Sequence, residues 1–286
     1  MTPLRKQYGE YLTLRGYSER TKESYISAVA GLAKHYWRSP EKIGDAEIRT
    51  YLLERHREGL SLSTINVAVS GLRLFYAAVL HRSMDGLKEC LPHMRPATRR
   101  PRVYSREELA RLFANCHDVR FRTFLLTIYG AGLRLNEACD LRVSDIDSDR
   151  LMLRIEQGKG AKDRYTILSP WLLVELRRYY ACCRPQSWLF PSRHDPSRPM
   201  IDGSAQKMFY AALKKAGLPN RGGIHCLRHS FATHLLEEGG DLVTLKKLLG
   251  HAHFATTANY IAVTREHIRG VPSPLDPPLK AATPVQ

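Results

Sequence analysis

Twelve residues between Leu91 and Arg102 constrain the fold of this chain more than any other feature of its sequence. They read LPHMRPATRRPR, with three prolines, four arginines and no acidic residue. Because proline lacks a backbone N–H and breaks helices, the segment predicts an extended basic linker between two separately folding domains. We therefore expect domains at residues 1–90 and 103–269, joined by the linker at 91–102 and followed by a mobile proline-rich tail at 270–286.

The first domain is predicted to be four short helices. Apolar residues recur at helical spacing, as in the second helix, where they follow Tyr25 at i+3, i+4, i+7 and i+8. Residues that end or cap helices separate the four segments: Gly16, Ser18, Asp45, and either Ser61 or Ser63.

The second domain is predicted to combine helices with a small antiparallel sheet. Leu151, Leu153 and Ile155 alternate with polar residues, and a glycine turn at 158–160 leads to a second strand at 164–167, which indicates a hairpin. The fold class expected for the whole chain is mainly α (α+β).

Helices are expected on both sides of this hairpin. Ser105 and Glu108 form a capping-box pattern before an apolar run. Later helices are predicted from His225 to Glu238 and from Asp241 to Gly250, with a last one starting at Thr256 or Thr257.

Charge indicates the kind of partner. Lys and Arg total 44 against 28 for Asp and Glu, which gives a net charge of +16 and is typical of a protein that meets nucleic acid. The sequence has neither a long apolar run nor an apolar signal peptide, so we expect a cytoplasmic, nucleoid-associated protein without a membrane partner. The six cysteines form no CxxC pair and are expected to be reduced thiols.

Four clusters could carry chemistry. In the first, Arg134 precedes Glu137 by three residues, so the carboxylate can hold the guanidinium, although an ordinary exposed ion pair has the same spacing. In the second, Lys159 lies between two glycines on the hairpin turn; this turn lacks the Lys-Ser/Thr end of a Walker loop, and a solvated turn is the simpler interpretation.

The third cluster is the sharpest. His225 and Arg228 lie three residues apart at a predicted helix start, where backbone amides favour an anion, and together they resemble a phosphate clamp. His225 and His229 could instead ligate zinc, but no HExxH glutamate or paired cysteine supports that reading. His234 is expected to be packed or exposed rather than functional.

In the fourth cluster, His251 follows a helix end and Tyr260 lies early on the next helix. A single tyrosine on a helix usually belongs to the core, yet near several cations its phenol can serve as a nucleophile. Jointly the clusters supply two arginines, a lysine, two histidines and a tyrosine without paired carboxylates for a metal. This set suits phosphoryl transfer on a diester.

These motifs resemble the tyrosine recombinase family, of the phage integrase and Xer type, from about residue 4 to 266. The stretches that carry the resemblance are YLTLRGYSERTKESY at 11–25, AGLRLNE at 131–137, HCLRHSFATH at 225–234, LLGH at 248–251 and TTANY at 256–260. The resemblance implies a SAM-like core-binding domain followed by a catalytic domain, which together clamp duplex DNA.

The resemblance also implies roles for individual residues. Arg134 and Arg228 would grip the scissile phosphate, and His225 and His251 would hydrogen-bond its oxygens, with His225 a candidate to take the tyrosine proton. Lys159 would be the general acid, Tyr260 would form a 3′-phosphotyrosyl link, and Glu137 would orient the site. Neither metal nor ATP would be needed.

The implied partners are double-stranded DNA recombination sites, bound by a homotetramer at synapsis that is a monomer or dimer when free. The residues we expect to contact DNA phosphates lie in the linker and on the hairpin: Arg95, Arg99, Arg100, Arg102, Lys162 and Arg164.

Two departures bear on the biological role. The family often has histidine two residues after the nucleophile, where this chain has Ala262, and prolines after Gly270 argue against the long docking helix of Xer proteins. A mobile-element integrase therefore fits better than a chromosome resolvase. The alternatives are a non-catalytic helix-turn-helix regulator using residues 241–261, an Xer-type resolvase, a topoisomerase of related chemistry and, more remotely, a metal nuclease.

Overall fold

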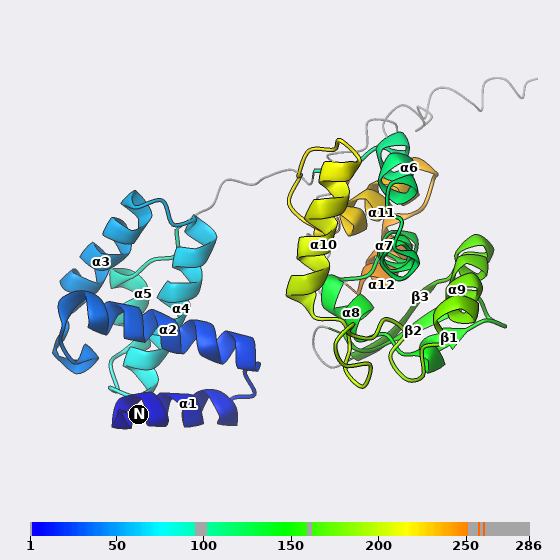
Figure 1. Ribbon diagram of the computed structural model, residues 1–286. Coiled ribbons are helices and arrows are strands. Elements are labelled where there is room, and N and C mark those ends of the chain that lie inside the picture. Colours follow the sequence, from blue (N-terminus) through cyan, green and yellow to red (C-terminus); the bar gives the residue numbers. More distant parts are fainter. Residues whose placement is uncertain (1, 95–101, 159–161, 251–256, 258–259, 261–286) are drawn as a thin grey trace, which may run out of the picture. The chain divides into compact units, whose positions relative to one another are not determined.

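The computed structural model describes residues 2–94, 102–158, 162–250, 257 and 260 (Figure 1). Contacts divide the chain into one unit at residues 1–98 and another at 99–286. Among the described residues, no helix is both long and apolar enough to span a membrane.

The N-terminal unit is entirely helical in its described part. Its elements are α1 (Pro3–Leu14), α2 (Glu19–Tyr36), the 3₁₀ turn η1 (Pro40–Lys42), α3 (Asp45–Arg57), α4 (Leu62–Ala78) and α5 (Met84–Cys90). Helices α2 and α4 pack along one another, with core residues such as Leu32 and Leu72 fully buried. The predicted caps Ser18 and Ser61 are confirmed, since each side chain accepts a hydrogen bond from the backbone N–H three residues later.

Three details differ from the sequence-based expectation. Gly44, not Asp45, is the N-cap of α3, and the Glu47 carboxylate accepts a bond from its N–H at 2.9 Å. A fifth helix, α5, follows the four predicted ones. The start of the predicted linker belongs to this unit, because Leu91 is buried in its core and Asn66 pairs with the backbone of Met94.

The C-terminal unit places a small sheet among helices. Before the sheet come α6 (Arg106–Ala114), α7 (Val119–Ala131), α8 (Leu135–Cys139) and η2 (Val143–Asp145). The strands are β1 (Ile146–Asp147), β2 (Met152–Gly158) and β3 (Lys162–Ile167). After them come α9 (Pro170–Cys183), α10 (Asp202–Lys215), α11 (His225–Glu237) and α12 (Leu242–Leu249). The predicted mainly helical class with a small antiparallel sheet is confirmed.

The sheet has the order β1-β2-β3 with antiparallel neighbours, and the predicted hairpin is β2–β3. Leu153 and Ile155 point into the core as predicted. Leu151 does not: it precedes β2 with a positive φ of 53° and is exposed. The short strand β1 was not expected.

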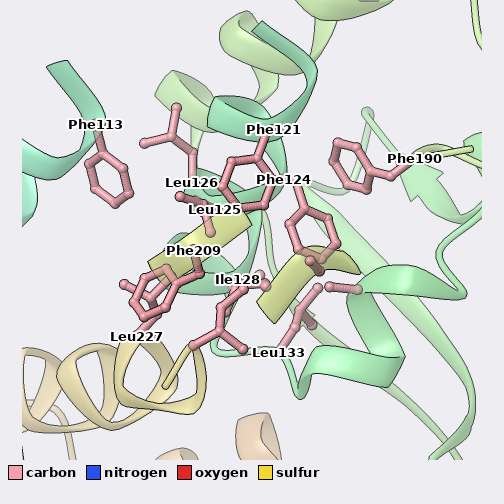
Figure 2. Close-up of a cluster of buried hydrophobic side chains, with 14 of the residues drawn as sticks. Phe113, Phe121, Phe124, Leu125, Leu126, Ile128, Leu133, Phe190, Phe209 and Leu227 are labelled. Atoms are coloured by element: carbon pink, nitrogen blue, oxygen red, sulfur yellow. The ribbon is translucent and has the colours of Figure 1, made fainter. Parts of the chain in front are cut away.

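Helix α7 lies at the centre of this unit and contacts α6, α8, α9, α11 and β3. Its Phe121, Phe124, Leu125 and Ile128 are buried among side chains of the surrounding helices (Figure 2). Burying side chains of this size contributes about 1.5–3 kcal/mol each. The core therefore fixes the end of α7, after which the site residues begin.

Candidate active site

The turn after α7 places Arg134. Gly132 ends the helix in a left-handed conformation with φ of 64°, which glycine adopts at little cost. A Cβ at this position would lie 2.4 Å from the Phe231 ring of α11, so a side chain here would force that ring to shift. Arg134 follows as the N-cap of α8, and its position is fixed by this close contact between α7 and α11.

The Glu137 carboxylate is the centre of a buried cation cluster. Its Oε2 accepts a bond from the Arg134 N–H at 2.7 Å and one from Arg164 Nη2 at 2.9 Å, while Oε1 accepts from Arg134 Nη1 at 2.6 Å. Arg228 Nη1 lies 3.6 Å from Oε2. Burial disfavours the carboxylate charge, but Arg164 and Arg134 outweigh it and lower the pKa of Glu137.

Arg228 is buried on α11, with only 1% of the residue exposed. Its guanidinium donates to Gly132 O at 2.7 Å and to Leu249 O at 2.6 Å, so it joins the ends of α7 and α12. Arg134 similarly donates to Gly250 O at 3.1 Å. Burial and the nearby Arg134 lower the pKa of Arg228 to about 9, so its charge persists at pH 7.

Arg164 is in a position different from the one expected. Instead of a surface contact for DNA, its side chain is 11% exposed and pairs with Glu137. Its Nε donates to Leu248 O at 3.1 Å, and Nη1 is a buried nitrogen that has no hydrogen-bond partner among the described residues. The Arg164 side chain therefore connects β3 to α12 and to the cation cluster, because it donates hydrogen bonds to Leu248 and Glu137.

Two histidines of α11 contact each other, and one of them also contacts Tyr260. The rings of His225 and His229 meet edge to face with centroids 4.7 Å apart. His229 Nδ1 lies 2.9 Å from the Tyr260 hydroxyl, and Tyr260 is 3% exposed. Tyr260 thus contacts the residue that follows Arg228 on α11, and its role as a nucleophile stays a prediction.

The surroundings shift the pKa values of all three groups. Burial of the imidazole, then the neighbours His229, Arg228 and Arg134, lower the pKa of His225 to about 4, so the imidazole is neutral at pH 7 although the residue as a whole is exposed. Burial and then Arg228 lower the pKa of His229. Burial raises the pKa of Tyr260, whereas Arg228 and Arg134 oppose the rise. The site is therefore positive, with neutral imidazoles and a neutral phenol.

Several predicted residues lie outside the described part of the chain. These are Lys159, His251, Arg95, Arg99 and Arg100, together with most of the last predicted helix. Lys162 begins β3, where only its backbone is described, and Arg102 is exposed ahead of α6. The helix-turn-helix alternative depends on residues beyond Gly250 that also lie largely outside the described part.

Two features of the site were not predicted. His229 contacts the tyrosine, although the sequence suggested it only as a zinc ligand, and Arg164 belongs to the cluster rather than to a surface. The i, i+4 spacing of His225 and His229 could have indicated that both face one site. Among the described residues, no group of three or more His, Cys, Asp or Glu side chains is arranged to hold a metal ion.

Comparisons with known proteins agree with this geometry. Residues 102–267 match the phage integrase family, and residues 4–85 match the phage integrase N-terminal SAM-like domain. A Sinorhizobium fredii protein with an integrase/recombinase name is 38% identical over 281 residues, covering 96% of this chain and 89% of that protein. The XerA tyrosine recombinase of Thermococcus onnurineus is 32% identical over 281 residues, covering 92% of each.

Among solved structures, a lambda integrase tetramer bound to a Holliday junction has a similar fold. Its TM-score is 0.73 at 19% identity, over 90% of this chain and 76% of that one. Because the two family matches span nearly all of the sequence, the chain belongs to the phage integrase family and is a tyrosine-type site-specific recombinase.

Proposed function

We propose that this recombinase cuts and rejoins double-stranded DNA at recombination sites through a 3′-phosphotyrosyl link formed by Tyr260. The observation that carries the proposal is the burial of Tyr260 beside Arg228 and Arg134, whose charges act on its phenol. Two fixed cations beside a phenol can stabilise the charge that builds on a phosphodiester as the phenolic oxygen attacks.

The remaining roles follow from the residues' chemistry and the family resemblance. Arg134 and Arg228 would bind the non-bridging oxygens, and Glu137 would hold both guanidiniums in place. His225 and His251 would hydrogen-bond the phosphate, and Lys159 would protonate the 5′-oxygen as it leaves. Because the link conserves the energy of the broken ester, rejoining requires neither ATP nor metal.

DNA must displace part of the covering structure to reach this site. Arg228 is 1% exposed and Tyr260 3% exposed. Arg228 and Arg134 also donate to carbonyls at the end of α12, so a phosphate would replace neutral acceptors with a charged one. We therefore propose that DNA binding moves the C-terminal end of α12 away from Arg228 and Arg134.

The proposal includes an assembly and a wider DNA contact. By analogy with the tetramer of lambda integrase on a Holliday junction, four protomers would assemble at synapsis. Arg95, Arg99, Arg100, Arg102 and Lys162 would contact phosphates outside the cleavage position. Such contacts are sequence-independent, so binding should weaken steeply with salt.

We further propose that the recombinase serves a mobile element. Prolines after Gly270 disfavour the long docking helix of a chromosome resolvase. Sequencing the DNA that flanks the gene tests this role: terminal repeats are expected, whereas a single fixed chromosomal site in related strains would contradict it.

The central experiment changes only the nucleophile. On a nicked suicide substrate in EDTA, the wild type should form a covalent protein–DNA adduct, and Tyr260→Phe should form none, because a phenyl ring has no oxygen to attack phosphorus. Denaturing gel electrophoresis measures the adduct.

Tyr179→Phe is the matched control. Tyr179 is also a buried tyrosine of the same unit, and its hydroxyl donates to Leu189 O at 2.8 Å. This variant should keep adduct formation despite losing a buried hydroxyl. Adduct formed by Tyr260→Phe would show that the nucleophile is wrongly assigned.

A further inference from the structure

Helix α11 supplies the histidine of two histidine–tyrosine pairs that have the same Nδ1–hydroxyl distance but different ring angles, 50° for His229–Tyr260 and 81° for His234–Tyr129. His229 Nδ1 lies 2.9 Å from the Tyr260 hydroxyl, and His234 Nδ1 lies 2.9 Å from the Tyr129 hydroxyl. The pairs differ in their surroundings: the first adjoins Arg228 and His225, whereas the second adjoins Arg106 and the acidic Glu238. Only the first pair contains the proposed nucleophile.

His229 is held firmly in this position. It follows Arg228 directly on α11, and the guanidinium of Arg228 is fixed by the carbonyls of Gly132 and Leu249. The edge-to-face contact with His225 supports the ring from the preceding turn. His229 is thus the next residue in the chain after a fixed arginine, and its ring is supported by the contact with His225.

We propose that His229, rather than His225, is the catalytic residue that accepts the proton of Tyr260 when the phenol attacks DNA. The inference rests on the proposed function and names a residue of that same site. The contact that carries it is direct, because the Nδ1 atom lies within hydrogen-bond distance of the oxygen that reacts.

In the proposed step, the Tyr260 O–H bond breaks and its proton passes to Nδ1 of His229. Before the transfer His229 is neutral and carries its single N–H proton on Nε2. The Tyr260 oxygen forms a bond to phosphorus, and the bond from phosphorus to the 5′-oxygen breaks with its electron pair on that oxygen. Lys159 supplies the proton for the 5′-hydroxyl. In the rejoining step, His229 returns its proton to the tyrosine oxygen.

The charges around His229 suit this role. Burial and Arg228 lower its pKa, so at pH 7 the imidazole is neutral and its acceptor nitrogen is available. The groups that face it in the described structure are Arg228, His225 and the Tyr260 phenol itself. His225, with a pKa lowered to about 4, is a weaker base.

The test replaces the base with a group of similar shape that cannot take a proton. In His229→Asn the amide oxygen can still accept a hydrogen bond from the phenol. We expect adduct formation on the nicked substrate to slow about 100-fold, with unchanged DNA affinity by fluorescence anisotropy. The deficit should narrow as pH rises, because solution hydroxide increasingly supplies the tyrosinate.

His234→Asn is the matched control. It removes a buried histidine from the same helix and the same type of bond to a tyrosine hydroxyl. We expect it to lower the melting temperature while leaving the adduct rate and its pH profile unchanged. A loss of rate in His229→Asn that reflected only weaker packing would appear in this control as well.

A 5′-bridging phosphorothiolate substrate separates the two proton transfers. A thiolate leaves without protonation, so this substrate should rescue Lys159→Ala and should not rescue His229→Asn. Rescue of both variants would overturn the proposal, as would a His229→Asn rate within about threefold of wild type, a small fraction of the expected loss.

The outcomes also separate this inference from the proposed function. If Tyr260→Phe forms adduct, the proposed function fails at its nucleophile. If Tyr260→Phe forms none and His229→Asn cleaves normally while His225→Asn shows the pH-dependent loss, only the assignment of the base fails, and His225 takes that role.

Discussion

Two Arg–Glu pairs with the same i, i+3 spacing lie in the two units of this chain. Arg55 and Glu58, at the end of α3, meet at 2.5 Å with side chains 40% and 53% exposed. Arg134 and Glu137, at the start of α8, meet at 2.6 Å with side chains 24% and 8% exposed. The local sequence pattern is the same, and what differs is the structure that covers each pair.

The difference shows how a common surface motif becomes part of a site. Arg164 from β3 and Arg228 from α11 reach the same carboxylate. An exposed ion pair contributes about 0.2–1 kcal/mol, whereas removing one partner of a buried charge network costs about 3–5 kcal/mol. Glu137 therefore holds three cations together, while Glu58 is nearly dispensable.

The largest expected effect is that of Glu137→Gln. Removing the carboxylate charge leaves one buried and two partly buried guanidiniums without their shared anion, so we expect the C-terminal unit to lose about 3–5 kcal/mol of stability. Hydrogen–deuterium exchange across urea denaturation measures this, because it reports on the two units separately.

Glu58→Gln is the matched change in the N-terminal unit, with an expected loss of at most about 1 kcal/mol. Equal losses in the two variants would show that burial does not distinguish the two pairs.

A smaller effect is expected from Gly132→Ala. Alanine would have to adopt a left-handed conformation, which costs about 1–2 kcal/mol, and would press against Phe231 at 2.4 Å. Gly16 has a similar φ of 70°, but a Cβ added there would meet no atom within 4 Å. Gly16→Ala should therefore lose only the free energy needed to hold alanine in the left-handed conformation.

Thermal melting of both variants measures this contrast. Adduct formation by Gly132→Ala should also fall, because Arg134 follows the strained turn. A Gly16→Ala variant as destabilised as Gly132→Ala would contradict the importance of the Phe231 contact.

Mild acid should produce the smallest effect, because the lowered pKa of Glu137 keeps most of its carboxylate ionised there, whereas full protonation would remove the same charge as Glu137→Gln. The pKa of Glu137 is lowered from its usual 4.5 by its cations, despite burial. Its stabilising contribution is therefore complete above the unfolded-state pKa and is lost as pH falls through the lowered pKa.

The stability difference between wild type and Glu137→Gln should accordingly narrow from about pH 5 downward. Urea denaturation at a series of pH values measures it. A difference that stays constant or widens in acid would mean that the Glu137 charge is not what stabilises the cluster.

The sequence predicted what local chemistry determines. Ser105 and Glu108 form the capping box that their spacing indicates, and Asp241 and Gly250 bound α12 as predicted. The closeness of Arg134 and Glu137 was likewise predictable from spacing alone.

Long-range packing decided the rest. Arg164 reaches the carbonyl of Leu248, 84 residues away, and His229 reaches Tyr260, 31 residues away. A local sequence pattern does not indicate partners this far away in the chain, and the pattern around Arg164 therefore predicts a surface contact for DNA. Strand β1 has only two residues, too few to show alternation.

The arginines of the cluster donate largely to main-chain oxygens, namely those of Gly132, Leu248, Leu249 and Gly250. Every amino acid carries such an oxygen, whatever its side chain. Substitutions of exposed residues on α12 should therefore leave these hydrogen bonds in place. The path of the main chain at the end of α12, rather than the side chains on it, determines where the guanidiniums lie.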